Sequence, residues 1–168
     1  MRALVDRLVT AQIGATFNQY SDPRLAERLV RYLESRAGAP LMLVGEAAGY
    51  RGARISGIPF TSERQLTASG PAEATATIVH RVLADLGLEE DVLLWNIVPT
   101  HPGTHSSNRS PTRLEVQAGL LFALELAHGR RVLAVGRIAE VALSAPYVRH
   151  PSHGGASAFR ETLRAYLR

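Results

Sequence analysis

Residues 41–49 read Leu41-Met42-Leu43-Val44-Gly45-Glu46-Ala47-Ala48-Gly49. The first four side chains form an apolar run without alternation, and the run ends abruptly at a glycine. This pattern is typical of a short strand that is covered on both faces. We therefore expect residues 41–44 to form the first central strand of a buried sheet, followed by a functional loop over residues 45–70.

Apolar runs typical of strands and segments with helical spacing alternate along the rest of the chain. Apolar runs predict further strands at 92–98, 132–135 and 147–149, and helical spacing predicts helices at 21–38, 71–86, 112–128, 138–143 and 156–167. Thr112 and Glu115 have the spacing of a helix-capping box. Buried strands that alternate with helices predict an α/β fold, a three-layer αβα sandwich around a central four-stranded parallel sheet.

The length and composition narrow the class of protein. The 168 residues suit a single domain, 1–168, with a helical N-terminal segment, 1–38, and a core, 39–168. Cysteine is absent, which excludes disulfides and thiolate-held metals. All 19 basic residues are arginine, which excludes a lysine Schiff base, and the net charge of +4 suits an anionic partner. No apolar stretch has the length of a membrane span or the form of a secretory signal, so we expect a cytoplasmic protein without a membrane partner.

Three polar segments follow predicted strands, so a parallel sheet brings them to one edge. These are the loops 45–70 and 99–111 and the segment 150–155. Their most distinctive sequences are Gly57-Ile58-Pro59-Phe60-Thr61-Ser62, Asn108-Arg109-Ser110-Pro111-Thr112 and His150-Pro151-Ser152, to which the strand residues Trp95-Asn96-Ile97-Val98 add a buried amide.

In content, order and spacing, these segments over residues 39–159 resemble the uracil-DNA glycosylase superfamily. They are most similar to its branch with a Gly-Glu-Ala-Pro-Gly first motif and a His-Pro-Ser second motif. This chain differs from that branch at Ala48, which replaces the proline, and it lacks the cysteines that hold an iron–sulfur cluster there. The resemblance implies a monomeric, cofactor-free enzyme of base excision repair that hydrolyses the N-glycosidic bond of uracil in DNA. Two alternatives remain: a glycosylase for hypoxanthine, xanthine or mismatched thymine, and a nucleic-acid-binding member of the fold with weak catalysis.

The resemblance implies two catalytic side chains. Glu46 is the first carboxylate of its loop and would activate water or stabilise a cationic sugar, although a surface glutamate is the simpler interpretation. His150 would stabilise the anion of the departing base, although a purely structural histidine is an alternative.

The base-binding residues implied by the resemblance are Gly45, Ala47, Gly49, Phe60 and Asn96. Phe60 would stack on an extruded base, or else anchor its loop in the core. Asn96 would read the mixed donor and acceptor edge of uracil, or else bond to neighbouring backbone. Gly49 stands where the branch most restricted to uracil carries a tyrosine that blocks the methyl group of thymine.

The implied DNA-binding residues are Asn108, Arg109, Pro151, Ser152 and Gly154. Ser152 and nearby backbone N–H groups would hold a phosphate, while Asn108 and Arg109 would orient their loop or contact phosphates.

A metal-dependent hydrolase is the competing interpretation of the histidines. His101 and His105 are four residues apart, and His150 and His153 are three apart. The first pair lies in a loop with proline and glycine, however, and no His-Glu-x-x-His sequence accompanies it. We therefore expect no metal site.

Overall fold

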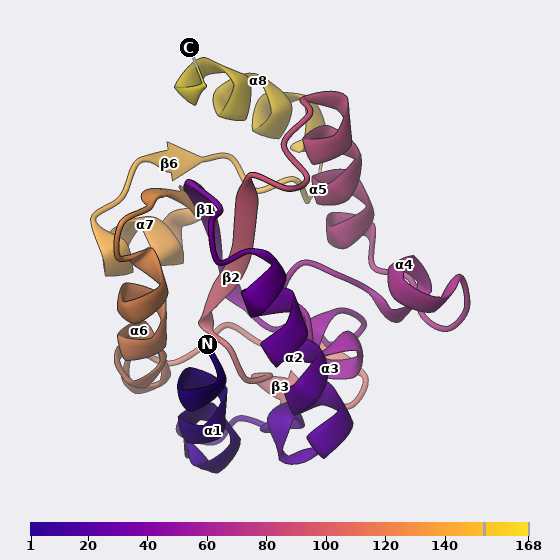
Figure 1. Cartoon of the computed structure of the whole chain (residues 1–168), viewed down its shortest axis with the longest axis vertical. Helices are drawn as coiled ribbons and strands as arrows, with labels where there is room; N and C mark the ends of the chain where they lie inside the picture. The colour runs from indigo at the N-terminus through magenta and orange to yellow at the C-terminus, as the bar shows by residue number, and fades with distance from the viewer. Residues whose placement is uncertain (153, 168) are drawn as a thin grey trace.

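The computed structural model describes residues 1–152 and 154–167 (Figure 1). Its central sheet contains four parallel strands in the order β2-β1-β5-β6. These strands are β1 (Leu41–Ala47), β2 (Val92–Val98), β5 (Arg131–Val135) and β6 (Tyr147–Val148). Helices flank the sheet, which confirms the predicted αβα sandwich with a four-stranded parallel sheet.

The helices fall before, between and after these strands. They are α1 (Arg2–Thr10), a 3₁₀ turn η1 (Gln19–Ser21), α2 (Pro23–Ser35), α3 (Ala53–Ser56), α4 (Glu63–Thr67), α5 (Ala74–Asp85), α6 (Arg113–Ala127), α7 (Arg137–Leu143) and α8 (Ala156–Tyr166). A small antiparallel hairpin, β3 (Gly103–Thr104) with β4 (Ser107–Asn108), lies between β2 and α6. None of the helices in the described ranges has the length and apolar character needed to cross a bilayer.

Alternate side chains of the central strands enter two separate apolar cores. Met42 and Val44 of β1 pack with residues of α1, α2, α6 and α7, whereas Leu41 and Leu43 pack with residues of α5 and α8. Figure 1 shows α5 and α8 together at one end of the molecule, away from α1 and α2. The strands carry apolar residues at successive positions because both faces of the sheet are covered.

Local sequence signals set the starts of two helices, α2 and α6. Asp22 caps α2 by accepting a hydrogen bond from the backbone N–H of Arg24, and Pro23 occupies the first turn. At α6, Thr112 and Glu115 form the predicted capping box, in which each side chain accepts from the other's backbone N–H.

Four local predictions were wrong. Strand β1 continues past Val44 to Ala47, because Gly45 and Ala47 pair with Asn96 and Val98 of β2. The loop expected at residues 45–70 contains α3 and α4, and the hairpin interrupts the loop expected at 99–111. Residues 71–73 precede α5 and are not its first turn.

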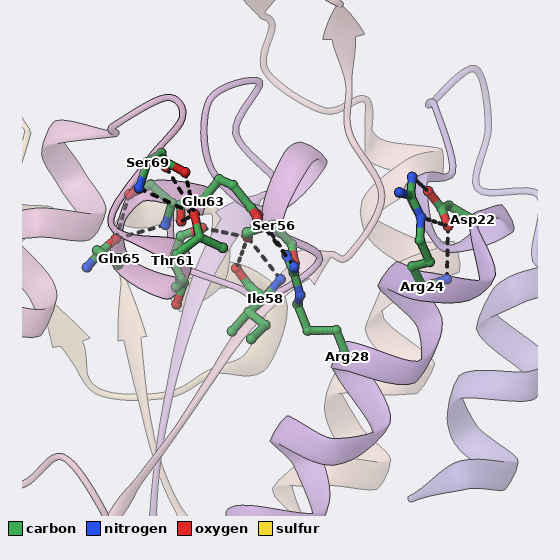
Figure 2. Close-up of polar contacts among 11 residues, drawn as sticks. Asp22, Arg24, Arg28, Ser56, Ile58, Thr61, Glu63, Gln65 and Ser69 are labelled. Atoms are coloured by element: carbon green, nitrogen blue, oxygen red, sulfur yellow. Dashed lines mark hydrogen bonds and ion pairs between the residues drawn. The ribbon is translucent and has the colours of Figure 1, made fainter.

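Polar contacts from α2 hold the first of these loops against the body of the molecule (Figure 2). Arg28 donates to the carbonyl oxygen of Ser56 at 2.9 Å and forms an ion pair with Glu63 at 2.7 Å. The Ser56 hydroxyl donates in turn to the carbonyl oxygen of Thr61 at 2.6 Å. These bonds fix both flanks of the segment that carries Phe60.

Candidate active site

A cavity of about 170 Å³ opens where β1, β2 and β6 end, at the edge of the sheet where parallel α/β folds bind ligands. Its walls combine both loops with the residue that follows β6. They are formed by Glu46, Ala47, Ala48, Gly49, Ala53, Phe60, Glu73, Thr75, Asn96, Pro102, Asn108, Arg109 and His150. Eight of the twelve site residues singled out from the sequence therefore line one cavity.

Asn96 presents the side chain best suited to recognise a ligand. It lies on β2 beside Gly45 of β1 and is only 4% exposed. Its amide makes no hydrogen bond to any residue in the ranges 1–152 and 154–167. Because its amide nitrogen and oxygen are not sealed from solvent, water in the cavity can bond to them, and a bound ligand can replace that water. No backbone group of the described residues bonds to the Asn96 side chain, and its base-reading role stays a prediction.

Gly45 belongs to the site although it is not part of the cavity wall. A methyl group at this position would lie 2.3 Å from Cζ of Phe60 and 3.0 Å from Oδ1 of Asn96. Only glycine therefore leaves room for both the aromatic ring and the amide beside this position.

Phe60 both anchors its loop and faces the cavity. It is 7% exposed and packs against the core shared by α5 and α8, yet its ring lines the cavity wall. Its φ of +53° is uncommon for a bulky residue, and such strain is concentrated at functional sites. Its neighbour Thr61 is fixed by a 3.0 Å hydrogen bond between its hydroxyl and Nε2 of His80.

Glu46 places a carboxylate at the end of β1. Burial raises the pKa of this carboxyl above its usual range, and the Ser110 side chain partly offsets the effect. Glu46 lines the cavity, and the raised pKa makes its carboxylate a stronger base. Both features suit it to orient and deprotonate water.

Sequence reasoning missed a second carboxylate, that of Glu73. It lies immediately before α5 and lines the same cavity. Burial raises the pKa of this carboxyl as well. No motif or periodicity marks Glu73, and only the packing of residues 71–73 against the first loop brings it into the site.

His150 follows β6, and its ring orientation is fixed by Ser152. Nδ1 accepts the backbone N–H of Ser152 at 3.2 Å and lies 2.8 Å from the Ser152 hydroxyl. Because Nδ1 accepts, the proton of the neutral ring resides on Nε2. The imidazole therefore lines the cavity in the tautomer that donates through Nε2.

The second loop contributes Asn108 and Arg109. Oδ1 of Asn108 accepts the backbone N–H of Tyr50 at 2.9 Å, which links the two loops. Arg109 donates to both carboxylate oxygens of Glu115 at 2.8 and 2.6 Å. This ion pair supports the loop-orienting role considered for Arg109, while a phosphate contact by the same side chain remains a prediction.

Pro151, Ser152 and Gly154 are not part of the cavity wall. Pro151 is buried, Ser152 holds His150, and Gly154 is exposed in the left-handed region with φ of +75°. The contact with DNA that we expect of these residues would therefore lie at the rim of the site.

The histidines considered as metal ligands do not converge in the described part of the chain. His101 is fully buried, and its Nδ1 and Nε2 lie 2.7 and 2.8 Å from the carbonyl oxygens of Ala48 and Thr104. It thereby joins the first loop to the hairpin. No cluster of three or more metal-binding side chains occurs in residues 1–152 and 154–167, and His153 lies outside them.

Comparisons with known proteins concern the fold and the family of the chain. The crystal structure of wild-type SMUG2 from Pedobacter heparinus superposes with a TM-score of 0.68 over 98% of this chain and 95% of that one, at 11% identity. This likeness concerns the fold alone, and no curated protein sequence matches the chain. The sequence model of the Uracil DNA glycosylase superfamily matches residues 34–165, and the chain belongs to that superfamily.

Proposed function

We propose that this protein is a monofunctional DNA glycosylase that hydrolyses the bond between uracil, or a related deaminated base, and deoxyribose. The observation that carries the proposal is the side chain of Asn96, which is 4% exposed, lines the cavity and makes no hydrogen bond to another described residue. Its amide nitrogen and oxygen match the O4 acceptor and N3–H donor of uracil. Membership of the superfamily supports DNA as the substrate.

The base reaches the cavity by rotating out of the DNA stack. Phe60 then supplies an aromatic face for stacking, and Asn96 bonds to the N3 and O4 edge. As the bond between C1′ and N1 breaks, its electron pair leaves with the base, and negative charge develops on N1 and O2. A hydrogen bond from Nε2 of His150 to O2 stabilises this charge.

Glu46 acts on the sugar side of the reaction. Its carboxylate stabilises the oxocarbenium-like C1′ and orients a water molecule toward it. The oxygen of that water forms the new bond to C1′, and its proton passes to the carboxylate. The products are a free base and an abasic site with an intact phosphate backbone.

The rim of the site would hold the DNA strand. Ser152, Gly154 and Pro151 lie next to His150 in the sequence, so phosphate contacts there bring the sugar to the catalytic side chains. Asn108 ties the second loop to the first, and Arg109 ties it to α6. The net charge of +4 favours association with DNA.

The test is a cleavage assay with purified protein and end-labelled oligonucleotides that carry one uracil, hypoxanthine, xanthine or G·T mismatch. Hot alkali converts each abasic site to a strand break, which a denaturing gel detects. We expect uracil to give the most product, in single-stranded or duplex DNA. Binding without any product from the four bases would refute the enzyme and leave a nucleic-acid-binding protein.

A further inference from the structure

Phe60 has a backbone conformation that needs support from its neighbours. Its φ of +53° lies in the left-handed region, which a bulky residue rarely occupies. The ring is nevertheless well buried and lies beside Gly45, where an added methyl group would collide with it. The proposed stacking of a base on Phe60 therefore depends on the contacts that keep this conformation in place.

Hydrogen bonds within the first loop shape the turn around Phe60. The Ser56 hydroxyl donates to the carbonyl oxygen of Thr61 at 2.6 Å and accepts the backbone N–H of Ile58 at 3.1 Å (Figure 2). The backbone N–H of Thr61 donates to the carbonyl oxygen of Ile58 at 3.2 Å. These bonds connect residues 56–61 with one another, so they do not tie the turn to the helix on which Phe60 packs.

His80 of α5 supplies that connection. Its Nε2 lies 3.0 Å from the hydroxyl oxygen of Thr61, and the hydroxyl itself donates to the carbonyl oxygen of Pro59 at 3.1 Å. Because the hydroxyl proton is directed at Pro59, the Thr61 oxygen accepts and Nε2 of His80 donates. The ring also forms a hydrogen bond with the backbone of Phe60. His80 therefore holds Phe60 and the residue that follows it.

The surroundings of His80 suit it to this task. Burial lowers the pKa of His80, so the ring is neutral near pH 7 and its N–H lies on Nε2. Thr61 is only 2% exposed, so water competes little for the bond between them. His80 is not part of the cavity wall. It can therefore act on a bound base only through the residues that it holds.

We infer that His80 is a positioning residue, which keeps the ring of Phe60 in the orientation on which an extruded base stacks. This inference rests on the proposed function, in which Phe60 supplies that aromatic face. Without the N–H of His80, the strained backbone of Phe60 relaxes in a fraction of the molecules, and the ring leaves the cavity wall. Only the remaining molecules hold the base productively, so base release slows while phosphate contacts still bind DNA.

Single-turnover release of uracil from one duplex, at saturating protein, measures this effect. His80→Leu removes the N–H and should lower the rate by about tenfold, the value of one hydrogen bond. DNA affinity, measured by fluorescence anisotropy, should change by less than about twofold. His80→Gln keeps a side-chain N–H and should restore most of the rate. The control is His128→Leu, at an exposed position, which should leave the rate unchanged.

The other partner of the bond gives a second pair of variants. Thr61→Val removes the hydroxyl with little change of shape and should slow uracil release as His80→Leu does, whereas Thr61→Ser keeps the hydroxyl and most of the rate. Since both losses remove the same bond, the double variant should be no slower than either single variant. Thermal melting verifies that each variant is folded at the assay temperature, and Thr61→Val serves as the test if His80→Leu is not.

A third comparison shows whether His80 acts through Phe60. Phe60→Leu keeps an apolar side chain but removes the aromatic face. In that background His80→Leu should slow uracil release by only about twofold or less, because no aromatic ring remains to be positioned.

The outcomes separate this inference from the proposed function. A tenfold loss that persists in the Phe60→Leu background, or a full rate in the folded His80→Leu or Thr61→Val protein, would overturn the role of His80, while uracil release by the wild type upheld the glycosylase. Absence of uracil release by the wild type would overturn the proposed function and this inference together.

Discussion

Glu46 is the residue whose chemistry depends most directly on its surroundings. Burial at the end of β1 raises its pKa, so the carboxyl remains protonated to a higher pH than an exposed glutamate would. Water activation requires the ionised form. The rate of base release should therefore increase with pH. The pH at which it increases should lie above the usual pKa range of a glutamate.

Replacing this carboxylate gives the first prediction. Glu46→Gln should lower the single-turnover rate by about a hundredfold or more, because it removes a group that acts on developing charge. DNA affinity, measured by fluorescence anisotropy, should stay close to that of the wild type. The loss of rate at acidic pH should also disappear in Glu46→Gln and persist in Glu73→Gln. Both carboxyls have raised pKa values, so the two variants show which of them controls the rate. If the loss of rate at acidic pH disappeared in Glu73→Gln instead, Glu73 and not Glu46 would be the carboxylate that activates water.

At the scale of elements, the contact of α6 with β2 depends on one glycine. Gly119 lies inside α6, where alanine ordinarily stabilises a helix by about 1 kcal/mol. Here a methyl group would lie 2.1 Å from the carbonyl oxygen of Ile97, which is backbone and cannot rotate away. Close packing of the helix on the strand that bears Asn96 therefore requires glycine.

We accordingly predict that Gly119→Ala lowers the free energy of unfolding by about 1 to 3 kcal/mol, the usual cost of overpacking. Denaturant unfolding followed by circular dichroism measures the change. Gly38→Ala is the control, because no atom lies within 4 Å of the added methyl group there. Equal stability of the two variants would show that α6 can shift without cost.

Glu115 connects three elements and gives the third prediction. Its carboxylate accepts from Arg109, from the backbone of Thr112 and from the backbone of Ala15. The hydrogen bond from Arg109 is the main cause that lowers the pKa of Glu115 to about 2. A depressed pKa in the folded state contributes stability that is complete above the unfolded pKa, about 4.5, and is lost as the pH falls toward 2.

Glu115→Gln should therefore be less stable than the wild type at pH 7, by about 2 kcal/mol. The difference should diminish between pH 4.5 and 2. Thermal or urea unfolding at a series of pH values measures it. A deficit that is the same at pH 2 and pH 7 would mean that the side chain acts through shape and not through its charge.

The elements differed in how far the sequence alone could predict them. Apolar runs identified all four strands of the central sheet, although β1 was predicted too short, and the signal at Thr112 located the start of α6, because these features are local. The hairpin at 103–108 and helices α3 and α4 were missed, since they are short and depend on tertiary contacts such as those of Arg28 and His101.

The same distinction applies to the site. Glu46, Asn96 and His150 follow from strand ends and motifs, and all three line the cavity. Glu73 could not be found in this way, because its position depends on how residues 71–73 pack against Gly49 and Gly52. Motif reasoning finds groups on the sheet edge and misses those that another element brings to it.

At the scale of the whole molecule, the absence of lysine restricts the chemistry. A glycosylase that also nicks DNA commonly does so through an imine between an amine and C1′. The fourth prediction is that borohydride, added during turnover on a uracil duplex, traps no covalent protein–DNA adduct on denaturing gels. A trapped adduct would assign the reaction to the terminal amine.

The central claim is that the cavity at the sheet edge binds an extruded uracil through Asn96 and releases it. The most direct measurement is the single-turnover release of free uracil from a uracil-containing duplex, quantified by chromatography for the wild type and for Asn96→Asp. The variant keeps the shape of the side chain but loses the donor to O4, and thermal melting verifies that it folds. We predict free uracil from the wild type and release about a hundredfold slower or more from Asn96→Asp. Equal rates for the two proteins, or no free uracil from the wild type, would contradict the account.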